Sequence, residues 1–192
     1  MPNDPLVLGE PISVGDALDE MIIVSSNVAA YMLADRVGWE RINEACEELG
    51  LSQTGLAYGE RSEQFDDWRA ELASTSPDDM LRYFTLMATG QLIDPNASSR
   101  MLHILASQRI DDRLPALLPS GVGVAHKTGD LESVVNDAGV IYGPEGRFIL
   151  VVLARETIPG QAADAQARLT RELYDLVLVR PIETVDAPDV LQ

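Results

Sequence analysis

The sequence is poor in basic residues, cysteine, histidine and aromatics, and each shortage excludes a class of function. Lys and Arg number 14 against 31 Asp and Glu, and the net charge of −17 argues against nucleic acid and anionic membranes, which need clustered basic side chains. The single cysteine, Cys46, allows no internal disulfide, and its place on an apolar helical face predicts a buried structural thiol. His103 and His126 lack metal-binding spacing, so we expect no metal and no other cofactor.

Long apolar runs are also absent. No stretch approaches the roughly 20 apolar residues of a membrane span. The first residues, Met1-Pro2-Asn3-Asp4-Pro5, are not basic and precede no apolar run long enough for a signal peptide. The chain by itself therefore leaves the localisation unknown, and its acidic residues are expected to form a solvated surface.

Two hydrophobic periods divide the chain. Up to residue 120 the apolar spacing predicts helices at 13–24, 27–37, 39–49, 76–90 and 95–107, with a long polar loop at 51–75. Later segments predict strands at 122–127, 134–142 and 147–154, followed by a helix at 162–178. We predict an α/β (α+β) fold: a helical lobe at 1–120, an antiparallel sheet of about three strands with a closing helix at 121–180, and a polar tail at 181–192.

The last predicted strand has a distinct composition. Residues 148–153 are continuously apolar, which is typical of a strand that is covered on both faces. We therefore expect both faces of this strand to be covered.

Two short motifs carry the chemistry. The only lysine stands in His126-Lys127-Thr128-Gly129, and Ser25-Ser26-Asn27 opens a predicted helix about a hundred residues earlier. Alone, either motif is unspecific, since Ser and Asn are common helix caps. Together, and with the segment at 136–144, they resemble the Lys-Thr-Gly and serine-asparagine elements of class A β-lactamases and penicillin-binding serine hydrolases. The resemblance covers about residues 11–179 and implies a β-lactamase/transpeptidase-like fold.

The resemblance implies a role for each residue of the lysine motif. Lys127 would place positive potential near the carboxylate of the substrate, and Thr128 would donate a hydrogen bond to it. Gly129 would let the substrate backbone approach the strand. Asp130 would offer its backbone N–H to the oxyanion.

The serine motif receives roles in the same way. Ser25 would relay a proton to the leaving nitrogen and contact Lys127, while Asn27 would contact the amide side chain of the substrate. Ser26 stands where the family keeps an Asp that braces this loop, so we expect a weakened loop.

The loop at 51–75 occupies the place of the family's omega loop. An ungapped comparison puts Glu60 at the water-activating base and Gln64 at a water-holding Asn. Ala57 and Tyr58 replace the ion pair that pins this loop, so the alternative is that Glu60 is an exposed acidic residue. The protein would then resemble a penicillin-binding protein more than a β-lactamase.

The family's nucleophile is a Ser three residues before a Lys, and Val124 occupies that position here. The family places this motif on a helix ahead of the matched region, so we expect a shortened chain whose exposed helix faces are covered by a homodimer contact or a partner. Four interpretations remain open. They are part of a serine hydrolase that acts on a β-lactam or D-alanyl peptide by acyl transfer, a non-catalytic relative that binds a cell-wall peptide or protein partner, a Ser25–Lys127 dyad, and an unrelated α/β binding module. The resemblance also implies a periplasmic or secreted protein with a role in antibiotic resistance.

Overall fold

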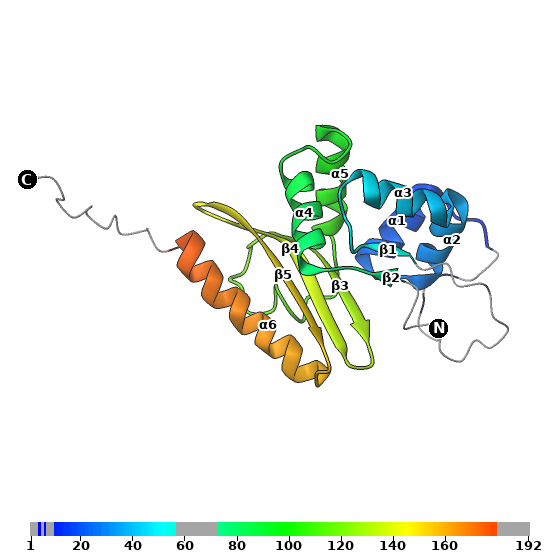
Figure 1. The fold of residues 1–192 in the computed structure, drawn as a ribbon. Coiled ribbons are helices and arrows are strands. Elements are labelled where there is room, and N and C mark those ends of the chain that lie inside the picture. The colour runs from blue at the N-terminus through cyan, green and yellow to red at the C-terminus, as the bar shows by residue number, and fades with distance from the viewer. Residues whose placement is uncertain (1–3, 5, 7–9, 57–72, 180–192) are drawn as a thin grey trace, which may run out of the picture.

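A computed structural model describes residues 4, 6, 10–56 and 73–179. The predicted order of helices, antiparallel sheet and closing helix is confirmed (Figure 1). The helices before the sheet are α1 (Val14–Ile23), α2 (Asn27–Val37), α3 (Trp39–Glu48), α4 (Pro77–Ala88) and α5 (Pro95–Leu105). No described helix has the length and apolar character needed to cross a membrane.

Side-chain caps fix where the helices begin. Ser13, Ser26, Ser76 and Asp94 each accept a hydrogen bond from the backbone N–H three residues later. Each such cap stabilises its helix by about 1 kcal/mol, because it satisfies an N–H that has no partner within the helix. The cap at Ser26 is also what places Ser25 immediately outside α2.

The main sheet is antiparallel in the order β3-β4-β5, formed by β3 (Val124–Leu131), β4 (Val134–Gly143) and β5 (Gly146–Arg155). The predicted end of the first strand at Lys127 was wrong. The ladder continues to the pair Leu131↔Val134, and only two residues form the turn between these strands. Thr128, Gly129 and Asp130 are therefore strand residues with a fixed alternation of faces.

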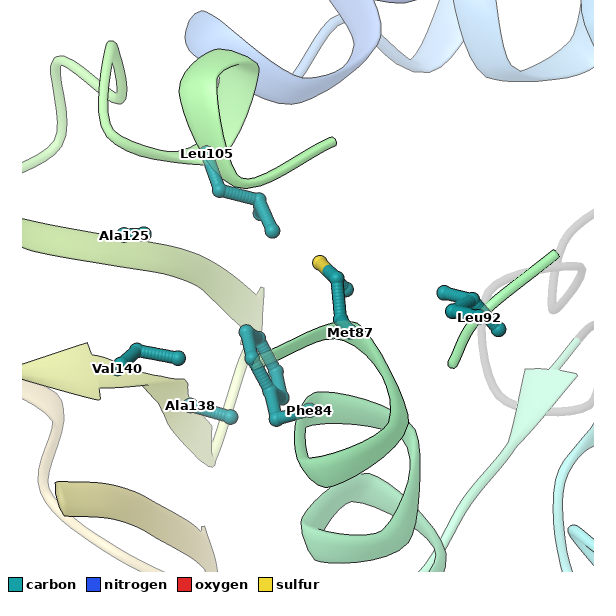
Figure 2. Close-up of a cluster of buried hydrophobic side chains, with 7 residues drawn as sticks. All are labelled: Phe84, Met87, Leu92, Leu105, Ala125, Ala138 and Val140. Carbon is teal, nitrogen blue, oxygen red and sulfur yellow. The ribbon is translucent and has the colours of Figure 1, made fainter. Parts of the chain in front are cut away.

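The helical lobe covers one face of the sheet. Figure 2 shows Phe84 of α4 lying beside Ala138 of β4, and Met87 and Val140 belong to the same buried cluster. The other members of this buried cluster are Leu92, Leu105 and Ala125.

The opposite face is covered by α6 (Pro159–Tyr174) and the π-helical turn Asp175–Val179 (Figure 1). Ile141 is fully buried there against Tyr174 and Leu178. The sheet is thus a middle layer between helices.

The prediction that the apolar strand is covered on both faces is confirmed. Ile149 and Val151 pack against the cluster beneath α4, and Phe148 and Leu150 pack against the cluster beneath α6. Residues 148–154 of β5 are all half-buried. These side chains stay partly exposed because β5 ends the sheet: among the described strands it pairs only with β4.

The described ends of the long loop are joined by a small ladder, in which β1 (Gly55–Leu56) pairs with β2 (Ala73–Ser74). Asn43 of α3 holds β1 through hydrogen bonds to the N–H and C=O of Leu56. Residues 57–72 and the predicted tail lie outside the described residues.

Cys46 is half-buried and lines a cavity of about 790 Å³ between α3, the β1–β2 pair and the sheet. The expectation of a buried thiol was wrong because α3 contributes no buried residue.

Candidate functional site

The two sequence motifs meet at the edge of β3. The Lys127 Nζ donates a hydrogen bond to the Ser25 Oγ at 2.8 Å and a second one to the Thr128 carbonyl oxygen at 2.7 Å. Ser25 and Lys127 are 102 residues apart in the chain. The two hydrogen bonds together hold the ammonium group at one place on the strand edge.

Ser25 occupies a strained turn between α1 and α2. Its φ of 58° lies in the left-handed region, which costs a residue with a Cβ on the order of 1 kcal/mol. The Ser26 N–H donates to the Glu20 carbonyl, and the Gln108 side chain donates to that of Ile22. These contacts hold the turn in the conformation that presents the Ser25 hydroxyl to Lys127.

Burial lowers the pKa of Lys127 to about 8. The negative charges of Asp137 and Asp130 act in the opposite direction, and Arg113 adds to the lowering. The side chain is therefore mostly protonated at neutral pH, but its charge is lost about one pH unit higher.

Thr128 is one of two described residues that have a buried polar side-chain atom without a hydrogen-bond partner; the other is Gln166. Thr128 is only 5% exposed, and its Oγ1 has no partner among the described residues. A buried hydroxyl left without a partner costs about 1–3 kcal/mol. Because the Thr128 Oγ1 is shielded from solvent, a ligand reaches it only when neighbouring groups move.

The strand register directs the Asp130 N–H outward. The Tyr142 N–H donates to the Gly123 carbonyl, so alternate residues of β3 from Gly123 onward exchange hydrogen bonds with β4. The backbone groups of Thr128 and Asp130 therefore point away from β4. An outward N–H at Asp130 is the geometry that an oxyanion donor needs.

Gly129 is not required by the protein's own packing. A Cβ placed there would lie 3.5 Å from the Asn136 Cβ, which is ordinary van der Waals contact, and φ is not in the left-handed region. The missing side chain instead leaves the strand surface open on the face that Gly129 shares with Lys127.

The serine loop has a brace that sequence reasoning missed. The Ser26 hydroxyl donates to Asp4 Oδ1 at 2.7 Å, and the Val28 N–H donates to Asp4 Oδ2 at 3.1 Å. Burial opposes ionisation of Asp4, but the hydrogen bonds from Ser26, Val28 and the backbone outweigh it and lower its pKa. Asp4 thus supplies a carboxylate to this loop, in which Ser26 stands at the position of the family's Asp. No local pattern in the sequence predicts this contact.

A buried polar group behind β3 was also missed. Asp137 is fully buried and accepts hydrogen bonds from the His126 Nδ1 at 2.9 Å and from the Leu114 N–H at 3.2 Å. The sequence showed only an isolated histidine, whereas the β3–β4 pairing places Asp137 directly opposite Thr128. The contact between His126 and Asp137 holds β3, the strand that carries Lys127, against β4.

Of the remaining predicted residues, the structure describes Asn27 but not Glu60 or Gln64. Asn27 is exposed and begins α2, two residues after Ser25. Glu60 and Gln64 lie outside the described residues. Within the described ranges, no group of three or more His, Cys, Asp or Glu side chains forms a metal site.

Known proteins are similar to this chain in sequence and fold. The extended-spectrum beta-lactamase PER-1 of Pseudomonas aeruginosa is 25% identical over 180 residues, which cover 86% of this chain and 58% of that protein. A mutant of PBP-A, solved as an acyl-enzyme complex with penicillin G, is 26% identical with a TM-score of 0.77 over 90% of this chain and 64% of that one. The beta-lactamase of Sphaerobacter thermophilus is 25% identical, with a TM-score of 0.79 over 92% of this chain and 68% of its own.

The chain spans about three-fifths of the length of these first two relatives. The fold is accordingly that of β-lactamases and transpeptidases. The model of the beta-lactamase enzyme family (Beta-lactamase2) matches residues 6–177, which is most of the sequence. The chain therefore belongs to the beta-lactamase enzyme family.

Proposed function

We propose that the edge of β3 is the recognition site for a β-lactam or D-alanyl peptide, and that it serves acyl transfer to a serine in the complete protein. One observation carries this proposal. The Lys127 ammonium is fixed against the Ser25 hydroxyl while the neighbouring Thr128 Oγ1 is buried without a partner among the described residues. A cation, a hydroxyl donor and an outward N–H on one strand edge suit the carboxylate and carbonyl of such a ligand.

The hydrogen-bond directions support a proton-relay role for Ser25. Its Oγ accepts from the Lys127 Nζ, so its own hydrogen is left to donate elsewhere. Donation to the leaving nitrogen of an acyl ligand would convert that nitrogen into a better leaving group. The nearby ammonium then stabilises the charge that develops on the Ser25 oxygen.

The relatives support the reaction class but not its details. PBP-A forms an acyl-enzyme with penicillin G, and PER-1 is an extended-spectrum beta-lactamase. The Ser-x-x-Lys nucleophile is absent from these 192 residues. We therefore assign recognition and proton relay to this chain, and hydrolysis with Glu60 as the base only to the complete protein.

Calorimetric titration with benzylpenicillin tests the recognition site. Thr128→Val keeps the side-chain shape and removes the hydroxyl, and we expect it to weaken binding about tenfold because one hydrogen bond to a charged ligand is lost. Thr85→Val on α4 is the matched control, because its hydroxyl donates only within the helix. Equal affinities for the wild type and Thr128→Val would refute the site.

A second candidate is the Ser25–Lys127 dyad, which the 2.8 Å contact and the lowered pKa of Lys127 favour. Intact mass after exposure to benzylpenicillin separates it from recognition alone. A penicillin adduct on this chain that disappears in Ser25→Ala would show acylation by the dyad. Reversible binding without an adduct would favour recognition, either by a non-catalytic relative or by part of a longer enzyme.

The same measurement on the protein from its own cells separates those two cases. A mass above 20.9 kDa that rises by one penicillin would identify an acylating enzyme of which this chain is one part. A mass near 20.9 kDa without an adduct would favour the non-catalytic relative.

A further inference from the structure

The guanidinium nearest the recognition site is already occupied by a carboxylate. The Arg113 Nη2 donates to both oxygens of Asp130, at 2.7 and 2.9 Å. The Arg113 Nη1 donates to the Asn136 carbonyl, and the Arg113 Nε donates to Asp112. Every nitrogen of this buried guanidinium therefore has an acceptor within the protein.

Asp130 lies where a ligand on the strand edge would meet it. Thr128 and Asp130 are two residues apart on β3, so their side chains share one face, about 7 Å apart along the strand. The Asp130 side chain is 51% exposed, whereas that of Arg113 is 5% exposed. A ligand that approaches the outward N–H of Asp130 thus meets the exposed carboxylate of Asp130 and not the buried guanidinium behind it.

The carboxylates around the site outnumber the cations, so its net charge is negative. The cations are Lys127 and Arg113. The nearby carboxylates are Asp111, Asp112, Asp130 and Asp137, which contact Arg113 or His126. A ligand carboxylate would therefore have to displace Asp130 or stand beside its charge.

We propose that Asp130 is a specificity-determining residue that makes this site prefer an acyl ligand whose carboxyl group is esterified or amidated over the same ligand with a free carboxylate. Bidentate pairing with Arg113 holds the Asp130 carboxylate in place. The guanidinium is the natural partner of a ligand carboxylate, and Asp130 removes it from use. This inference rests on the proposed recognition site and sharpens its ligand class.

The test compares benzylpenicillin with its methyl ester by calorimetry on the wild type, Asp130→Asn and Glu132→Gln. We expect the wild type to bind the ester more tightly, and Asp130→Asn to bind benzylpenicillin about tenfold more tightly than the wild type does while its affinity for the ester changes less than about twofold. Glu132→Gln removes the same charge from an exposed neighbouring residue, and the ratio of the two affinities should stay near the wild-type value.

The outcomes separate the inference from the function on which it rests. Equal binding of both ligands by the wild type, or an unchanged ratio in Asp130→Asn, would overturn the role of Asp130 and leave the recognition site standing. A ratio that changes equally in Glu132→Gln would show only a general charge effect and would also overturn it. Binding of neither ligand by any folded variant would refute the recognition site itself, and the inference with it.

Discussion

The two edges of the sheet differ in every respect that matters for function. The β3 edge carries Lys127 and Thr128 and is backed by the fully buried Asp137. The β5 edge is apolar along residues 148–154, and all of these side chains are half-buried. Among the strands that the structure describes, both pair on one side only, with β4. At the β3 edge, buried partners hold the polar side chains in place. The β5 edge presents apolar side chains, which need no such partners.

The difference shows how a polar site is kept rigid. The ammonium of Lys127 bonds the Thr128 carbonyl, which uses one of the outward backbone groups of the β3 edge. On β5, the backbone groups of every second residue point away from β4. No side chain of the described residues forms a hydrogen bond with these groups. We expect the β3 edge to lose function when a polar contact is removed, and the β5 edge to tolerate truncation.

The largest effect is expected from Asp137→Ala. Removal of this carboxylate leaves the His126 Nδ1 and the Leu114 N–H buried without their acceptor, and we expect a loss of about 3–5 kcal/mol in the free energy of unfolding. Val152→Ala, at the β5 position paired with Asp137, should cost only about 1 kcal/mol because this side chain is half-buried. Urea denaturation measures both, and comparable losses would break the contrast between the edges.

Next come two truncations against the same helix. Ile141→Ala on β4 should cost about 2–5 kcal/mol because the side chain is fully buried among Tyr174 and Leu178. Leu150 on β5 packs against the same cluster but is half-buried, so we expect Leu150→Ala to cost less than half of that loss. Thermal unfolding of the two variants would contradict this ranking if Leu150→Ala were the less stable.

A smaller effect is expected from pH. Because the pKa of Lys127 is lowered to about 8, the affinity for benzylpenicillin should fall as pH rises through 8, by up to about tenfold per unit, while the methyl ester is less affected. Lys127→Arg should flatten this profile, since a guanidinium stays charged. Calorimetry from pH 6.5 to 9.5 would refute the assignment if both ligands lost affinity in parallel.

Loss of folding does not produce the same profile through Lys127. The folded-state pKa lies below the ordinary value of 10.5, so the unfolded chain binds more protons between about pH 8 and 10.5. This group therefore makes the folded state more stable, relative to the unfolded state, as pH rises through that window. A weaker ligand affinity above pH 8 is then a property of the site.

The smallest expected effect is a difference in amide hydrogen exchange along β5, measured on the unmutated protein. Asp137 and Val152 form a hydrogen-bonded pair by the alternation of the ladders, so the N–H groups of Ile149, Val151 and Leu153 point away from β4. We expect these three amides to exchange faster than those of Leu150 and Val152. Equal protection of both sets would show that the β5 edge is covered.

Much of the fold was predictable because its signals are local. Ser76 and Pro77 mark the start of α4, and the apolar spacing of Phe84 and Met87 marks its buried face. The end of β3 was missed because Thr128, Gly129 and Asp130 are weak strand formers, and pairing with β4 overrides that preference. The cover on both faces of β5 was predicted from its apolar run, whereas its partial exposure was not, because strand composition does not tell which strand ends the sheet.

The candidate site was predictable in part for the same reason. Ser25, Asn27 and the Lys127 motif are recognisable as short patterns of residues. Asp4, Arg113 and Asp137 are not, because each acts through a partner distant in the chain: Ser26 is 22 residues from Asp4, and Asp130 is 17 residues from Arg113. Such contacts depend on packing rather than on spacing.

The sequence by itself determined the class of this protein: its helix starts, its antiparallel strands, and the lysine and serine motifs that belong to the beta-lactamase enzyme family. Only the tertiary structure decided that Lys127 meets Ser25, that Asp4 braces the serine loop and that Asp130 fills the guanidinium of Arg113. The physical reason is range. Caps and hydrophobic periods act within a few residues, whereas hydrogen bonds between charged groups form wherever the fold brings them together.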